Sequence, residues 1–159
     1  MSNLSRVPNS IPSTARSGER VSSVVATMER RARTPPLVGE ERIWLRNLRT
    51  VLDDVAVALG RAAGEREGLR ATIRREDPAT SARVGDLALR DATLTAQLED
   101  LRGRCSDQAA LSEDFPTVLD LARHLRVVAL AWCVAWRAYD AEERCYFAEA
   151  FYRDRGEVD

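Results

Sequence analysis

The sequence predicts an all-α protein: an antiparallel bundle of three long helices that follows a disordered N-terminal tail. Three observations support this fold class. Apolar residues recur at steps of three and four along three separate stretches, no stretch alternates as a strand does, and no helix lies between two strand-like segments. With 159 residues, of which 45% are hydrophobic, the chain can bury the core of one domain.

The N-terminal tail is predicted from composition. Residues 1–37 contain seven serines, four of the six prolines, and six arginines against two acidic residues. Such a segment buries too little apolar surface to offset the entropy lost on ordering it. Of the totals of 24 basic and 25 acidic residues, 18 and 23 remain in residues 38–159, so that part is acidic. We therefore expect two parts, a disordered basic tail over residues 1–37 and a helical bundle domain over residues 38–159.

The first helix is predicted to begin near Glu40 and to continue to about Glu76. Its apolar positions follow one another at steps of four and three: Trp44, Leu48, Val51, Val55, Ala58 and Ala62. Three glycines interrupt it, Gly60, Gly64 and Gly68, and each costs about 1 kcal/mol of helix propensity. Either the helix breaks between Gly60 and Gly68, or it is continuous and the glycines let another helix approach closely. The continuous helix is favoured because no proline or asparagine accompanies the glycines.

The second helix is expected to begin near Thr80, because Asp77 and Pro78 end the preceding one. Its apolar seam is close to a coiled-coil repeat and comprises Val84, Leu87, Leu94, Leu98 and Leu101. Asp91 occupies one position of this seam. It is either the exposed edge of the contact or a residue that fixes register or partner choice.

The third helix is predicted over residues 117–153, long enough to extend beyond the second. Seven of the nine aromatic residues lie in residues 132–152, most of them on one face of this helix. The opposite face is apolar only in the first half, through Val127, Leu130 and Val134. We therefore expect the first half to be buried on both sides and the second half on one side only.

The aromatic face supports two interpretations. In the first it is core packing, and Glu143, which lies within it, pairs inside the bundle. In the second the extending half binds a protein partner or a second copy, because Tyr and Trp are enriched at interface centres, and Glu143 pairs across the interface. The candidate partner-binding residues are Trp136, Tyr139, Glu143, Tyr146, Phe147 and Phe151.

A cluster of arginines in the tail, Arg30, Arg31 and Arg33, is a candidate for contact with nucleic acid or with an acidic partner. The acidic body carries the wrong sign for nucleic acid and has no helix-turn-helix spacing, so such binding would come from the tail. All 24 basic residues are arginine, a bias typical of a GC-rich genome, bacterial or viral.

Enzymatic activity is not predicted. The chain has no lysine for a Schiff base, no phosphate-binding loop, no His-Glu-x-x-His motif and a single histidine, His124. Its three cysteines are widely spaced, so we expect no metal site, and neither a cofactor nor a small-molecule substrate is indicated. The longest uncharged run, residues 127–136, is too short to span a membrane, and no secretory signal is recognisable. A cytoplasmic location is expected, or the host cytoplasm or nucleus if the source is viral.

These observations favour a non-enzymatic helical protein-interaction factor, such as an adaptor, a chaperone-like protein or an effector-type accessory protein. It would bind a protein partner, or a second copy, through the aromatic face of its last helix. The alternative is a nucleic-acid-associated regulator that uses the Arg-rich tail.

Overall fold

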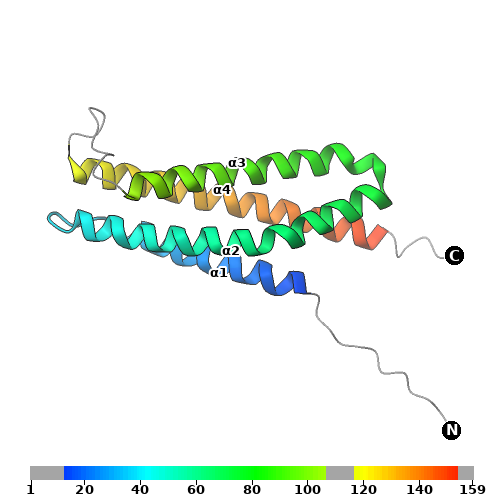
Figure 1. The fold of residues 1–159 in the computed structure, drawn as a ribbon, viewed down its shortest axis with the longest axis horizontal. Helices are drawn as coiled ribbons and strands as arrows, with labels where there is room; N and C mark the ends of the chain where they lie inside the picture. The colour runs from blue at the N-terminus through cyan, green and yellow to red at the C-terminus, as the bar shows by residue number, and fades with distance from the viewer. Residues whose placement is uncertain (1–12, 107–116, 154–159) are drawn as a thin grey trace, which may run out of the picture.

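The computed structural model describes residues 13–106 and 117–153, and these residues contain helices and no strands. Four helices run alternately up and down the molecule, and each packs against the next along the chain (Figure 1). A single 3₁₀ turn, η1, joins the second helix to the third. The elements are α1 (Ser13–Arg33), α2 (Glu41–Glu76), η1 (Pro78–Thr80), α3 (Ser81–Ser106) and α4 (Val118–Arg153). The all-α prediction is confirmed, but the bundle has four long helices where three were predicted.

The additional helix is α1, which lies in the segment predicted to be a disordered tail. Its inward positions follow steps of four, three and four, and all four side chains are fully buried: Val21, Val25, Met28 and Ala32. They pack against α2 and α4, so α1 belongs to the same core as the helices that follow it. The prediction of disorder is therefore wrong for Ser13–Arg33, because four buried side chains at helical spacing outweigh an unfavourable average composition. Residues 1–12 lie outside the described residues.

The end of α1 is held by side chains from two other helices. Trp44 of α2 donates its indole N–H to the carbonyl of Thr34 at 2.8 Å. Arg126 of α4 donates to the carbonyl of Ala32 at 2.9 Å and to that of Arg33 at 3.3 Å. The last carbonyls of a helix have no partner within the helix, so these bonds fix where α1 ends.

Helix α2 is continuous from Glu41 to Glu76, as the favoured alternative predicted. The glycines at 60, 64 and 68 all face solvent, and a Cβ built on any of them would meet nothing within 4 Å. The suggestion that they let another helix approach closely is therefore wrong within this bundle. At the end of the helix the Asp77 carboxylate accepts a hydrogen bond from the backbone N–H of Ala79 at 3.1 Å and shapes the turn into α3.

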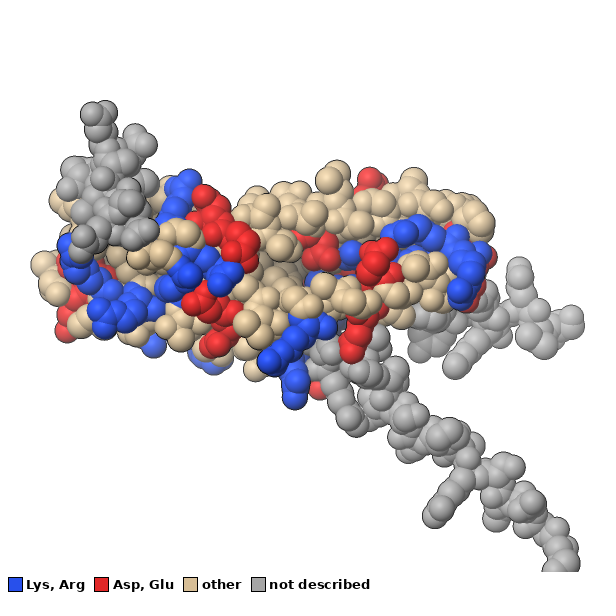
Figure 2. Space-filling view, in the orientation of Figure 1, with Lys and Arg blue, Asp and Glu red and all other residues tan. Residues whose placement is uncertain are grey.

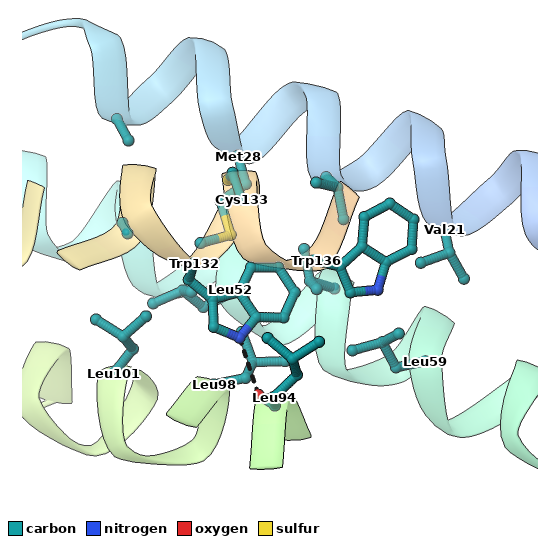
Figure 3. Close-up of a cluster of buried hydrophobic side chains, with 14 of the residues drawn as sticks. Val21, Met28, Leu52, Leu59, Leu94, Leu98, Leu101, Trp132, Cys133 and Trp136 are labelled. Carbon is teal, nitrogen blue, oxygen red and sulfur yellow. Dashed lines mark hydrogen bonds between the residues drawn. The ribbon is translucent and has the colours of Figure 1, made fainter. Parts of the chain in front are cut away.

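The core is centred on the tryptophans of α4. The predicted seam of α3 is buried, its residues Leu94, Leu98 and Leu101 face the tryptophans, and Val21, Met28, Leu52 and Leu59 close the other sides (Figure 3). Trp132 donates its indole N–H to the backbone carbonyl of Leu94 at 2.8 Å, which ties α4 to α3 inside the core. The bond satisfies the one polar atom of this buried side chain.

Helix α4 differs from the prediction in two respects. Its second half does not extend beyond the bundle. Helix α2 has the same number of residues, 36, and covers the second half of α4 as well as the first. Val127 and Val134, predicted to be buried on a second face, are instead 60% and 67% exposed. This second face of α4 is therefore turned to solvent, because the helix occupies one corner of a four-helix bundle rather than the centre. Within the described ranges, no helix has a stretch long and apolar enough to span a membrane.

Candidate functional site

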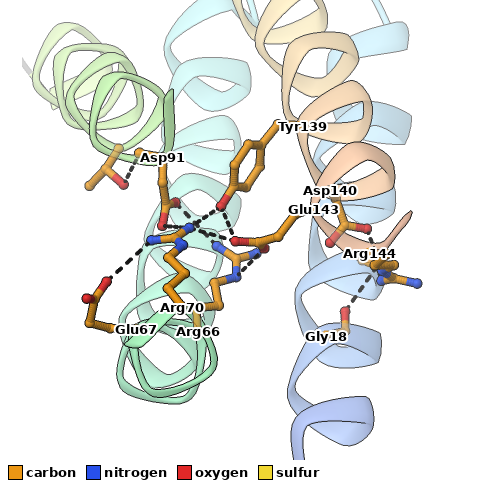
Figure 4. A network of polar contacts seen from close by, with 11 residues as sticks. Gly18, Arg66, Glu67, Arg70, Asp91, Tyr139, Asp140, Glu143 and Arg144 are labelled. Carbon is orange, nitrogen blue, oxygen red and sulfur yellow. Dashed lines mark hydrogen bonds and ion pairs between the residues drawn. The ribbon is translucent and has the colours of Figure 1, made fainter. Parts of the chain in front are cut away.

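Five polar side chains from three helices meet inside the bundle (Figure 4). They form a cluster that we call the ionic cluster: Arg66 and Arg70 of α2, Asp91 of α3, and Tyr139 and Glu143 of α4. Arg66 and Arg70 continue the buried stripe of α2, one turn apart, and Tyr139 and Glu143 do the same on α4. The helical period thus aims all four toward the bundle interior, where Asp91 reaches them from the α3 seam.

Arg70 is at the centre of the ionic cluster. Its Nη2 donates to Glu143 Oε1 at 2.6 Å, to Asp91 Oδ2 at 3.0 Å and to the Tyr139 hydroxyl at 2.5 Å. Tyr139 in turn donates its hydroxyl proton to the same Glu143 oxygen at 2.7 Å. The side chains of Arg70 and Glu143 are each only 5% exposed, so this pair is removed from solvent.

Arg66 completes the cluster from one turn earlier on α2. Its Nη1 lies 3.3 Å from Asp91 Oδ1 and its Nε lies 3.3 Å from Glu143 Oε2. Its guanidinium also stacks over the Tyr139 ring, 5.6 Å from the ring centroid, in the geometry of a cation–π contact. Two guanidiniums therefore face two carboxylates, and the cluster is neutral as a whole.

Burial and pairing shift the pKa values within the cluster. Burial alone would lower the pKa of Arg70, but Tyr139 and the carboxylates of Glu143 and Asp91 outweigh it and raise that pKa above its usual value. Burial, followed by the hydrogen bond to Glu143, raises the pKa of Tyr139 well above its usual range. Arg70 is therefore permanently charged and Tyr139 permanently protonated at physiological pH.

The contacts of the ionic cluster indicate what it can do. Every member is held by the others, so the cluster ties α2, α3 and α4 together at one register. Buried charges without partners would be strongly unfavourable, so a slip of α2, α3 or α4 by one turn is disfavoured. In residues 13–106 and 117–153 no group of three or more His, Cys, Asp or Glu side chains could hold a metal ion.

The predicted partner-binding residues lie mostly in the interior. Trp136, Tyr139, Glu143 and Tyr146 are buried, and Phe147 is partly buried against the core. Glu143 pairs inside the bundle, so the structure supports the packing interpretation of the aromatic face, and these four side chains are not presented to a partner. The side chain of Phe151 lies outside the described residues.

The predicted arginine contacts lie in the last turn of α1. Arg30 donates to the Thr27 hydroxyl at 2.8 Å, and Arg33 forms an ion pair with Glu29 at 2.5 Å. Arg30, Arg31 and Arg33 are all exposed. Positive charge at the C-terminal end of a helix is favourable to its dipole, so part of their role is to stabilise α1.

Sequence reasoning missed a second feature, the solvent-facing side of α4. Seven positions at alternating steps of four and three carry no charged residue and are all exposed. We call them the outer α4 face; they are Val127, Ala131, Val134, Ala138, Ala141, Cys145 and Ala148. An outward helix face is normally rich in charged residues, whereas this one is apolar over 22 residues of sequence. Its periodicity is visible in the sequence, but it was attributed to a second buried side.

The fold and its interior thus define an up-and-down four-helix bundle with a buried ionic cluster. Comparison with protein-family models, with curated proteins and with solved structures finds no match to this chain.

Proposed function

We propose that the protein is a non-enzymatic helical interaction protein that binds another helix along the outer α4 face. The observation that carries the proposal is the uninterrupted apolar surface of that face, with Val127 and Val134 exposed by 60% and 67%. Apolar positions at steps of four and three are what one helix presents to another in coiled-coil packing. The predicted interaction protein is thus retained, and the proposed surface moves from the aromatic side of α4 to the opposite side.

The polar residues of the interior favour this kind of function over catalysis. The titratable side chains of the ionic cluster contact one another in the interior, where Arg70 and Glu143 are each 5% exposed and Asp91 is 21% exposed. Groups that act on a substrate must be reachable from solvent or from a cavity. The ionic cluster is therefore proposed to specify the fold, and the outer α4 face to carry the function.

The size of the face sets the expected strength of binding. Burying a largely exposed valine contributes about 1 kcal/mol, and an alanine less. The free energy gained by burying one face is thus a few kcal/mol, and the entropy lost on association opposes it. We expect a weak, reversible interaction of the small-interface kind rather than an obligate complex.

Site-specific photo-crosslinking tests this proposal. A photoreactive amino acid is placed at residue 134 in the full-length protein, and at residue 89 in a matched control. Leu89 is similarly exposed, at 69%, but lies on α3 with Asp86, Arg90 and Thr93 around it. We expect adducts to a helical segment from residue 134 and few from residue 89. Equal crosslinking at the two positions would contradict the proposal.

Nucleic-acid binding through Arg30, Arg31 and Arg33 is retained as the alternative proposal, on the ground that all three are exposed. On the face in Figure 2, basic and acidic side chains lie in mixed clusters without a continuous basic surface. Deleting residues 1–37 cannot test it, because the deletion removes the buried residues of α1. The suitable variant is Arg30→Ala with Arg31→Ala, which should weaken binding and reduce its salt dependence.

A further inference from the structure

We infer that the helix bound by the outer α4 face is α4 of a second copy of this chain, parallel to the first and in register. This inference rests on the proposed function and names its partner. The face has the spacing of a coiled-coil seam, in which Ala131, Ala138 and Cys145 occupy one set of core positions. The other core positions are occupied by Val127, Val134, Ala141 and Ala148.

The charges that flank the seam identify the partner and its direction. Arg137 and Arg144 line one edge, and Glu142 and Glu149 line the other. In a parallel, in-register pair, each flanking residue lies next to the residue five positions later on the partner helix. Arg137 then meets Glu142 of the second copy, and Arg144 meets Glu149. The two pairs occur twice, once on each side of the seam.

An antiparallel pair would place like charges together. In that arrangement residues on the same edge of the two helices face each other, so arginine meets arginine and glutamate meets glutamate. Like charges at close range disfavour a pairing even at a solvated surface. The charge pattern therefore selects the parallel arrangement, although the small side chains of the seam would fit either.

The flanking charges are held in place and still accessible. All four side chains are between 43% and 56% exposed, so each keeps a solvent-facing side. Each also has a partner within its own bundle, and an arginine fork has enough donors to take a second carboxylate. The intramolecular partners are Glu29 for Arg137, Asp140 for Arg144, Arg90 for Glu142 and Arg83 for Glu149. These contacts limit the side-chain entropy lost when a second copy binds.

Cys145 makes the arrangement testable with the natural sequence. Among the described cysteines it is the exposed one, whereas Cys105 and Cys133 are buried. In the inferred dimer the two Cys145 thiols face each other across the seam. Diamide can then accept two electrons and two protons as the sulfur–sulfur bond forms.

The experiment is diamide oxidation of the full-length protein, followed on non-reducing gels. We expect a covalent dimer in the natural protein, its loss in Cys145→Ser, and its return in Cys145→Ser with Ala131→Cys. The matched control is Cys145→Ser with Ala92→Cys, an exposed position on α3. Dimers should form about tenfold faster at the two seam positions than at residue 92, because the seam raises the effective thiol concentration. Equal rates at all three positions would overturn the inference.

A charge-reversal series tests direction and separates this inference from the proposed function. Arg137→Glu with Arg144→Glu should slow dimer formation, and adding Glu142→Arg with Glu149→Arg should restore it. In a mixture of the natural protein with the Cys145→Ser, Val134→Cys variant, faster disulfide formation between residues 134 and 145 than between identical positions would indicate an antiparallel pair, in which the two sets of core positions face each other, and would contradict the inference. If the protein shows no self-crosslinking while residue 134 still forms adducts with another protein, the inference fails and the proposed function stands. If residue 134 forms no adducts at all, both fail.

Discussion

Replacing Glu143 by glutamine would leave the two buried guanidiniums of the ionic cluster with one carboxylate. Glutamine has nearly the same shape, so the substitution changes charge without opening a cavity. Glu143 accepts from Arg70 at 2.6 Å and from Tyr139 at 2.7 Å, and its other oxygen lies 3.3 Å from Arg66. Removing one partner of a buried ion pair destabilises by about 3–5 kcal/mol. Because glutamine keeps an acceptor oxygen, we expect the lower end, about 3 kcal/mol.

Urea unfolding followed by circular dichroism measures this loss, at a protein concentration low enough to keep the chain monomeric. The midpoint should fall without a change in slope, and the melting temperature should fall by about 6–12 °C. The matched control is Glu99→Gln, which breaks the surface ion pair with Arg102 at 2.6 Å and should cost at most about 1 kcal/mol. Equal losses in the two variants would refute the view that the ionic cluster specifies the fold.

Four further predictions concern the surroundings of individual side chains. Trp132→Phe removes the buried indole hydrogen bond to α3 and should lower the free energy of unfolding by at least about 1 kcal/mol in urea titrations. Gly64→Ala should raise it by about 0.5–1 kcal/mol, with a higher melting temperature, because an added Cβ meets nothing within 4 Å. Burial opposes ionisation of Asp53, but hydrogen bonds from two arginines prevail and lower its pKa below the unfolded-state value near 4. Its ionised form therefore stabilises the fold above about pH 4, and the difference between Asp53→Asn and the natural protein should vanish as the pH falls through the lowered pKa. Thiol titration of the native protein at pH 8 should modify Cys145 alone, because burial raises the pKa of the other two thiols to about 12, and reaction of all three at one rate would contradict this.

The spacing of apolar residues along the sequence predicted most of the buried faces of α2 and α3. The seam of α3 is buried as predicted, and so are Trp44, Leu48, Val55 and Ala62 of the predicted α2 stripe, whereas Val51 and Ala58 are only partly buried. Helix α1 was missed because serines and prolines dominate the average composition of residues 1–37, whereas its inward positions form a regular apolar stripe. The average composition of a segment hides an amphipathic helix when most of its residues are polar, whereas the spacing of the apolar residues still indicates the helix.

The candidate site was predicted less well than the fold. Glu143 was expected to pair either inside the bundle or across an interface, and the structure pairs it inside with Arg70 and Arg66. These two arginines were not singled out, although they continue the α2 stripe at positions where an apolar residue is the default. Apolarity at Val127 and Val134 was taken as burial. How many helices share the core decides which apolar faces are covered, and that number is a tertiary property that the local pattern does not contain.

Sedimentation equilibrium over a range of protein concentrations, with matched charge substitutions on two outer faces, tests whether α4 pairs with α4 of a second copy. We expect that the mass of the natural protein rises from monomer toward dimer with concentration, and that Leu89→Glu behaves in the same way. Val134→Glu should remain monomeric throughout, because it places two buried carboxylates opposite each other in the seam. A natural protein that stays monomeric at every concentration, or a Val134→Glu variant that associates as the natural protein does, would contradict the claim that α4 pairs with α4 of a second copy.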